Sequence, residues 1–310
     1  MTAARPTSEP RIVVQAELDS RINYAMQQND VPVVKSLIIE NGESEVLRDL
    51  EIRISAEPEF AVTWSKRLDV LAPSERFSTH GVDLQLSPSF LAELTERVRG
   101  NIWLEVVHDG APLIRQAESV ELLARDEWGG LSSLPEILAA FVTPNHPTVA
   151  QILRRASEVL GQFTGDPSLS GYQTRSQARV VTTAAAIYTA IRELDIGYAV
   201  PPASFEDQGQ RVRLPGRIAS EKLATCLDIT LFACACLEQA GLHPLIALVR
   251  GHAFAGVWLD EECFSDAVVD DGLRIRKRAE LGEIRLFDPT CATGGRHWIS
   301  TGRWRKRLVT

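Results

Sequence analysis

The sequence predicts an α+β protein of two domains, and three observations support this class. Apolar and polar side chains alternate with a period of two over roughly the first 125 residues, as in strands that bury one face. Beyond Asp126 the apolar residues recur with a helical period, and short apolar strands follow the helices. The 310 residues are enough for two separate hydrophobic cores. We expect a β-domain at residues 11–125, a connector at 126–147 and an α+β domain at 148–300, between a disordered tail at 1–10 and a basic tail at 301–310.

The predicted β-domain consists of short strands separated by turn-forming residues. A helical turn is expected within Ser89–Val98. Some seven short strands at this spacing are typical of an antiparallel β-sandwich of the immunoglobulin type. The expected strands are Arg11–Leu18, Pro32–Glu40, Leu50–Ser55, Phe60–Trp64, Val82–Ser87, Asn101–Val107 and Ser119–Ala124.

The second domain is predicted to contain three helices followed by a sheet. The first helix starts near Pro147, the second ends at Gly197, and the third follows Thr225. The third helix is apolar almost all round, so it is expected to be buried. The expected strands are Pro244–Arg250, His252–Leu259 and Gly282–Phe287.

Composition restricts the classes of function. The net charge of −8 argues against nucleic acid as the main partner, and the basic runs Arg274–Arg278 and Arg303–Arg307 are expected to be solvated. The first ten residues lack the apolar core of a signal peptide, and no apolar stretch is long enough to span a membrane. Five cysteines without framework spacing suit a reducing cytoplasm, and the absence of a CxxC pair argues against zinc. We therefore expect a cytoplasmic protein with no metal and no organic cofactor.

One of the three thiols in the third helix occupies an activating position. Thr225 is a suitable N-cap, and Asp228 completes the spacing of a capping box, which places Cys226 at the first helical position. Unpaired N–H groups and the helix dipole favour a thiolate there, and the same N–H groups can stabilise an oxyanion. Cys234 and Cys236 lie deeper in the helix, where a thiol packs as a small apolar side chain.

A buried cysteine in an apolar helix is usually part of the core, and the nearby Asp228 disfavours a thiolate. His252 favours the catalytic interpretation, because it opens a strand 26 residues after Cys226, with one strand between them. Asp288 ends a later strand before Pro289. A carboxylate there could orient the imidazole, as the third member of a triad does.

These residues resemble the transglutaminase-like fold of papain-type cysteine enzymes from about Val149 to Arg296. More specifically, "ASFEDQGQRVRLPGRI…ATCLDITLFACACLEQAGLHPLIALVRGHAFAGVWL" is similar to the transglutaminase-like domain of large bacterial proteins. In those proteins the domain precedes a superfamily 1 helicase, and some such architectures are associated with antiphage defence. The segment "DEWGGLSSLPEILAAFVTPNHPTVAQILRRASEVL" and the N-terminal sandwich resemble the same proteins. The resemblance implies Cys226 as nucleophile, His252 as base and Asp288 as orienting group.

Two features depart from that pattern. An insertion separates His252 from Asp288, so Asp260, Asp270 or Asp271 could take the orienting role instead. The sequence ends at Thr310 without a helicase, so we expect either part of a longer protein or a stand-alone relative.

Papain-like sites often use a further oxyanion donor, for which Gln210 and Tyr198 are candidates. We expect a cysteine enzyme that acts on a protein or peptide by amide hydrolysis or acyl transfer, with a helicase-type protein or covalently linked domain as a further partner. The alternative is a catalytically inactive recognition or scaffold module of the same fold.

Overall fold

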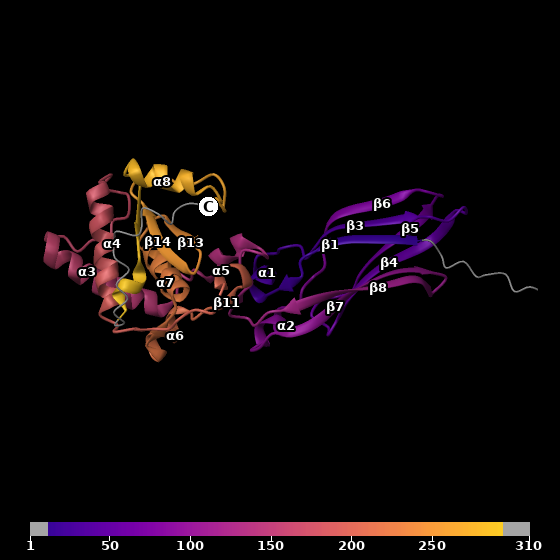
Figure 1. Ribbon diagram of the computed structural model, residues 1–310, viewed down its shortest axis with the longest axis horizontal. Helices are drawn as coiled ribbons and strands as arrows, with labels where there is room; N and C mark the ends of the chain where they lie inside the picture. The colour runs from indigo at the N-terminus through magenta and orange to yellow at the C-terminus, as the bar shows by residue number, and fades with distance from the viewer. Residues whose placement is uncertain (1–11, 294–310) are drawn as a thin grey trace, which may run out of the picture. The chain divides into compact units, whose positions relative to one another are not determined.

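The computed structural model describes residues 12–293, which form a mixed α+β protein (Figure 1). The chain divides into two compact units between Gly129 and Gly130, a division that falls inside the predicted connector. We refer to residues 12–129 as the N-terminal unit and to residues 130–293 as the C-terminal unit.

The N-terminal unit contains two sheets. One has the strand order β1-β3-β6 and is antiparallel. The other has the order β2-β8-β7-β4-β5 and is antiparallel except for the parallel pair of β2 and β8. The elements are β1 (Ile12–Leu18), β2 (Arg21–Ile22), α1 (Tyr24–Gln28), β3 (Val34–Asn41), β4 (Leu47–Glu57), β5 (Trp64–Leu71), β6 (Arg76–Val82), α2 (Pro88–Glu93), β7 (Val98–His108), β8 (Ala111–Leu122) and β9 (Glu127–Trp128).

Two of the expected strands are wrong in position. Residues 60–64 and 82–87 mostly lie outside the ladders, and the strands nearby are β5 and β6. Leu84 and Leu86 are buried although they follow β6, and Leu86 forms an isolated bridge with Ala61. The alternation of apolar residues at 82–87 is therefore explained by burial of an extended segment that is not a strand. Strands β5 and β6 expose most of their side chains, so they lack an apolar pattern that the sequence could show.

Alternation in the central strands is explained by burial of one sheet face. Ile52 and Ile54 of β4 are buried, as are Leu37 and Ile39 of β3. Burial of each such side chain contributes about 1.5–3 kcal/mol relative to exposure. The odd-numbered residues of β7 up to residue 105 point to the opposite face, which includes Trp103, whereas Val107 follows a shift in register and is buried.

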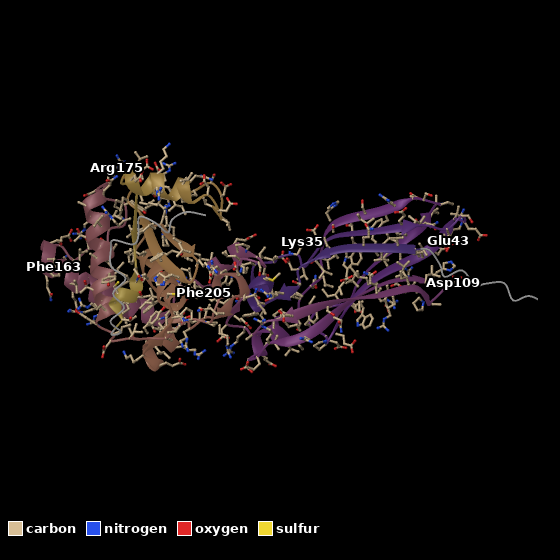
Figure 2. The ribbon with its side chains drawn as sticks, in the orientation of Figure 1. Lys35, Glu43, Asp109, Phe163, Arg175 and Phe205 are labelled. Carbon is tan, nitrogen blue, oxygen red and sulfur yellow. The ribbon has the colours of Figure 1, made fainter. Side chains whose placement is uncertain are left out.

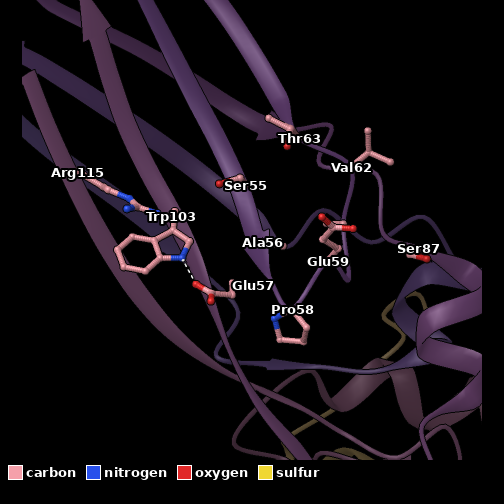
Figure 3. A pocket seen from close by; sticks show the side chains of 11 residues that line it. Ser55, Ala56, Glu57, Pro58, Glu59, Val62, Thr63, Ser87, Trp103 and Arg115 are labelled. Atoms are coloured by element: carbon pink, nitrogen blue, oxygen red, sulfur yellow. Dashed lines mark hydrogen bonds between the residues drawn. The ribbon is translucent and has the colours of Figure 1, made fainter. Parts of the chain in front are cut away.

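Trp103 borders a hollow of about 600 Å³ on this outward face (Figure 3). Its indole N–H donates to Glu57 Oε2 at 3.0 Å, and the guanidinium of Arg115 lies 3.9 Å from the ring centroid. A hydrogen bond and a cation–π contact thus hold a large aromatic side chain on the outward face of the sheet. The end of β4 and the loop at residues 58–63 provide most of the remaining lining.

The C-terminal unit combines three long helices with a three-stranded antiparallel sheet of order β13-β14-β15. Its main elements are α3 (Pro147–Thr164), α4 (Gln177–Arg192), α7 (Cys226–Gln239), β13 (Pro244–Val249), β14 (His252–Trp258) and β15 (Ile284–Phe287). Short elements connect them: η1 (Pro135–Phe141), β10 (Gly197–Tyr198), α5 (Phe205–Gln208), β11 (Gln210–Arg211), α6 (Pro215–Glu221), β12 (Leu223–Ala224), α8 (Gly272–Glu280) and η2 (Pro289–Ala292).

Helix α7 lies at the centre of this unit, in contact with β13 and β14 as well as with α3 and α4 (Figure 1). Every residue from Cys226 to Leu237 is buried, which explains why the helix has no polar face. Burial raises the pKa of both Cys234 and Cys236, so these thiols stay neutral and pack as apolar groups.

The predicted end of the second helix is wrong. Helix α4 ends at Arg192, and Gly197 instead begins β10. Asp195 adopts the left-handed conformation (φ +52°), which interrupts the helix although Leu194 and Ile196 continue the apolar pattern. Within residues 12–293, no helix has the length and apolar character needed to cross a membrane.

Candidate active site

The capping box at the start of α7 fixes the position of Cys226. Thr225 Oγ1 accepts from Asp228 N at 3.2 Å, and Asp228 Oδ2 accepts from Thr225 N at 2.9 Å, as the spacing of these residues predicts. The first intrahelical bond runs from Ile229 N to Thr225 O. The N–H groups of Cys226 and Leu227 precede that bond, so they belong to the part of a helix that can donate to an anion.

Arg213 offsets the negative charge of Asp228. Asp228 has an exposed fraction of 0 %, and its Oδ2 lies 3.2 Å from Arg213 Nη1. Its Oδ1 accepts from the backbone N of Arg213 at 2.9 Å. The carboxylate that the sequence places close to Cys226 is therefore paired with a guanidinium, which reduces its effect on a thiolate.

The hairpin of β13 and β14 brings His252 to the beginning of α7. Its ladder ends at the pair of Val249 and His252, and Gly251 turns the chain with φ +75°. The imidazole of His252 is close enough to the Cys226 side chain for the two groups to interact electrostatically. It also packs against the ring of Phe254, with the two centroids 4.5 Å apart.

Asp288 forms a hydrogen bond with the imidazole. His252 Nε2 is 3.0 Å from Asp288 Oδ2, and both side chains are largely buried. The other carboxylate oxygen, Oδ1, accepts from Thr290 N at 2.9 Å and from Thr290 Oγ1 at 2.7 Å. Thr290 thus fixes the orientation of Asp288, and Asp288 engages Nε2 of His252, so that Nδ1 is the ring nitrogen without a bond to Asp288.

The pKa shifts of His252 and Asp288 favour a protonated imidazole next to an ionised carboxylate. Burial lowers the pKa of His252, but hydrogen bonds and charge interactions with Asp288 and Cys226 outweigh burial and raise it to about 9. Burial likewise opposes ionisation of Asp288, yet the hydrogen bonds to His252 and Thr290 lower its pKa overall.

The competing carboxylates of the insertion have other surroundings. Asp260 Oδ2 accepts from Gln177 Nε2 at 2.6 Å, and Asp271 caps α8 by accepting from Leu273 N at 2.9 Å. Asp270 is exposed. Of the four aspartates considered, Asp288 is the one at hydrogen-bond distance from His252.

Tyr198 lies close to the sulfur. Strand β10 pairs in parallel with β12, which sets Tyr198 opposite Ala224, two residues before Cys226. The Tyr198 hydroxyl is close enough to the Cys226 side chain for the two groups to interact electrostatically. Burial, followed by the interactions with Cys226 and Asp288, raises the pKa of Tyr198 to about 12, so its hydroxyl remains a donor at neutral pH.

Gln210 lies beside the helix cap. Its Nε2 donates to Thr225 Oγ1 at 2.8 Å, and the side chain is buried. Its Oε1 is buried without a hydrogen-bond partner among the described residues. One amide hydrogen is therefore committed to the N-cap of α7, and the role of Gln210 as an oxyanion donor stays a prediction.

Sequence reasoning missed two residues beside this cluster, Arg213 and Glu206. Arg213 pairs with Asp228 across 15 positions, and Glu206 accepts from Gly251 N at 3.0 Å across 45 positions. Neither separation follows a helical or strand period. The segment that carries both residues, "YAVPPASFEDQGQRVRLP", is rich in polar side chains, and this is the one signal that the sequence offers for them.

The candidate nucleophile is covered. The exposed fraction of Cys226 is 0 %, whereas Cys263 and Cys291 are exposed. Among residues 12–293, no group of three or more His, Cys, Asp or Glu side chains is arranged to hold a metal ion.

Comparisons with known proteins identify no family. No protein-family model matches the chain, and no curated protein matches it. Among solved structures, a crystal structure of a family 76 glycoside hydrolase from a bovine Bacteroides thetaiotaomicron strain is similar at 8 % identity and a TM-score of 0.17. The similarity covers 73 % of this chain and 48 % of that chain. At this TM-score it supports no statement about fold or function.

Proposed function

We propose that the C-terminal unit is a transglutaminase-like, papain-type cysteine enzyme that hydrolyses amides or transfers acyl groups through a Cys226 thioester. The observation that supports this most directly is the hydrogen-bonded pair of His252 and Asp288 beside the Cys226 side chain. In the same proposal, the N-terminal unit is an immunoglobulin-like sandwich. The sequence resemblance suggests a bacterial defence or helicase-type system as the context.

In the proposed reaction His252 Nδ1 holds the proton of the Cys226 thiol, and the sulfur attacks the carbonyl carbon of an amide. The carbonyl π electrons move to oxygen, and the resulting oxyanion accepts from the N–H groups at the start of α7. Collapse of this intermediate breaks the C–N bond, and the imidazolium gives its proton to the leaving amine. Water or a second amine then attacks the thioester carbonyl, and its proton passes through His252 to the departing sulfur.

Asp288 has a supporting part in this scheme. Its carboxylate accepts from Nε2–H of His252 and so selects the tautomer in which Nδ1 faces the sulfur. The raised pKa of His252, about 9, is what an ion pair of imidazolium with its two neighbours requires. Tyr198 is a further proposed oxyanion donor, because β10 places it opposite Ala224, beside the start of α7, and its hydroxyl interacts with the Cys226 side chain.

The complete burial of Cys226 favours a second candidate function. A substrate carbonyl cannot reach a sulfur with an exposed fraction of 0 %, so the enzymatic proposal requires the groups that cover Cys226 to move. A recognition or scaffold module requires no such movement. Burial therefore predicts a slow reaction of the Cys226 thiol, whereas the proposed interaction with His252 predicts a fast one.

Alkylation with iodoacetamide separates the two candidates. If accessibility decides the rate, Cys263 and Cys291 react and Cys226 does not. If the proposed site is functional, Cys226 reacts faster than Cys263 at pH 6, where ordinary thiols are protonated by more than 99 % given a pKa of about 8.5. Mass spectrometry of tryptic peptides measures all the rates in one sample.

Slow labelling of Cys226 at every pH in the folded protein would favour the module. Substrate profiling with a peptide library then identifies the acyl donor, with the Cys226→Ala variant as the control that cannot form a thioester. Release of free acid or of an amine-linked product distinguishes hydrolysis from acyl transfer.

A further inference from the structure

Glu206 is a buried carboxylate that the proposed reaction does not use. It belongs to the short helix α5, and its exposed fraction is 7 %. The preceding residue, Phe205, which is labelled in Figure 2, is buried completely. The following residue, Asp207, is exposed. The backbone of α5 is therefore fixed by apolar packing, independently of the carboxylate of Glu206.

This carboxylate binds the turn that precedes His252. Glu206 Oε1 accepts from Gly251 N at 3.0 Å. Arg250 and Gly251 form the exposed tip of the hairpin, and the ladder pair of Val249 and His252 closes it. Gly251 has φ +75°, and no atom beyond its own chain neighbours lies within 4 Å of the position where a side chain would begin. No neighbouring group packs against Gly251 at that position. The hydrogen bond from Gly251 N to Glu206 Oε1 is therefore the contact that holds the turn.

The second oxygen of Glu206 indicates that this arrangement is not a fully satisfied polar network. Oε2 is buried and has no hydrogen-bond partner among the described residues. Burying a carboxylate with one oxygen unbonded is unfavourable for folding, so the group is a poor stabilising element. Such a side chain is better explained by what its bonded oxygen holds in place.

We propose that Glu206 is a positioning residue for His252, acting through the backbone of Gly251. This inference rests on the proposed function, since it assigns Glu206 a part in aligning the imidazole between Asp288 and Cys226. Loss of the bond frees the hairpin tip, and the first residue of β14 moves with it. The contact that carries this role is a hydrogen bond in which Glu206 Oε1 accepts from the backbone of Gly251, so the role requires an acceptor oxygen at this position.

The test compares Glu206→Ala, Glu206→Gln and Asp207→Ala. Glutamine keeps an acceptor oxygen, and Asp207→Ala removes an acidic side chain from the same helix without touching Gly251. NMR titration of His252 is the first readout. We expect a pKa of about 9 in the wild type and in Asp207→Ala, a similar value in Glu206→Gln, and a fall toward about 6.5 in Glu206→Ala.

The rate of Cys226 alkylation at pH 6 is the second readout, and we expect it to fall on the order of tenfold in Glu206→Ala. The glutamine variant should recover to within about twofold of the wild-type rate. If Glu206→Ala does not fold, Gly251→Ala provides the same test from the other partner. Its strained backbone displaces the turn, and the pKa of His252 should fall in the same way.

The outcomes separate this inference from the proposed function. The positioning role is overturned if Glu206→Ala has the wild-type His252 titration and the wild-type rate of Cys226 alkylation. If His252→Ala slows that alkylation strongly in the same experiment, the enzyme proposal remains intact. The proposed function is overturned if Cys226 is alkylated slowly in the wild type and His252→Ala does not change that rate. A shift of the His252 titration in Glu206→Ala would still support the positioning role in that case.

Discussion

His252 Nε2 and Asp288 Oδ2 lie 3.0 Å apart although 36 residues separate them in the chain. The register of β14 and β15 accounts for this proximity. Ala255 pairs with Phe287, so the chain that continues from Phe287 to Asp288 runs toward the residues at the start of β14. The insertion between the two strands leaves from their other ends and forms α8, and its length does not affect the pair.

Substitution of His252 and of Asp288 should affect Cys226 to different extents. In His252→Ala the thiolate loses its cationic partner, and alkylation at pH 6 should slow on the order of a hundredfold. In Asp288→Asn the base remains but is misoriented, so we expect a smaller decrease, on the order of tenfold. Circular dichroism and thermal unfolding should show folded proteins in both cases. Equal rates in His252→Ala and the wild type would make Cys226 an ordinary core residue.

Much of this geometry could be predicted from local sequence patterns. The capping box at Thr225, the strand that starts at His252 and the strand that ends before Asp288 are all present as expected. Each depends on neighbouring residues, through helix capping or alternation, and such signals are readable in a single chain.

The partners of these residues could not be predicted in the same way. Arg213 reaches Asp228, and Glu206 reaches Gly251, through contacts that depend on how irregular segments fold over α7. Strands β5 and β6 were misplaced for a related reason, since exposed strands carry little apolar alternation. Burial of the third helix, by contrast, is expected from its apolar composition and is confirmed, Cys226 included.

Tyr198→Phe tests the proposed oxyanion donor. Acylation by a p-nitrophenyl ester develops charge on the carbonyl oxygen, whereas alkylation by iodoacetamide displaces iodide and develops none there. Loss of one donor should therefore slow acylation by about tenfold or more and leave alkylation nearly unchanged. The burst of p-nitrophenolate measures acylation. If both rates rise together, the hydroxyl merely covers the sulfur, and Tyr198 is not an oxyanion donor.

Arg213→Met should destabilise the C-terminal unit because it leaves the completely buried Asp228 without its cationic partner. The backbone N–H groups of Arg213 and Thr225 still donate to the carboxylate, so we expect a loss of about 2–3 kcal/mol, below the usual range for breaking a buried pair. Arg217→Met is the matched control, since its pair with Glu221 is at the surface and should contribute less than about 1 kcal/mol. Urea unfolding measures both. Equal losses in the two variants would contradict the assigned role of Arg213.

The pair of His252 and Asp288 should make stability depend on pH in a defined direction. The folded pKa of His252 is raised to about 9 from an ordinary value of 6.5, so the folded state binds the proton more tightly. The stabilisation is complete below about pH 6.5, decreases above it and is lost as the pH rises through about 9. The lowered pKa of Asp288 acts in the opposite sense, with a contribution present at neutral pH and lost on acidification below the ordinary value of 3.8.

Urea unfolding between pH 3 and 10 measures this dependence, and Cys226→Ser is the suitable background because it removes the titration of the neighbouring thiol. In that background, the stability advantage over the double variant Cys226→Ser/His252→Ala should be largest between about pH 4 and 6.5. It should decrease as the pH rises above 6.5, because the imidazole loses the proton that it shares with Asp288, and the decrease should be complete below pH 9, because the part of the raised pKa that Cys226 provides is absent from this background. Groups elsewhere in the chain titrate equally in both proteins and cancel from the difference. Parallel stability curves for the two proteins over this whole range would show that His252 has no ionic partner in solution, and the triad would then lack its central member.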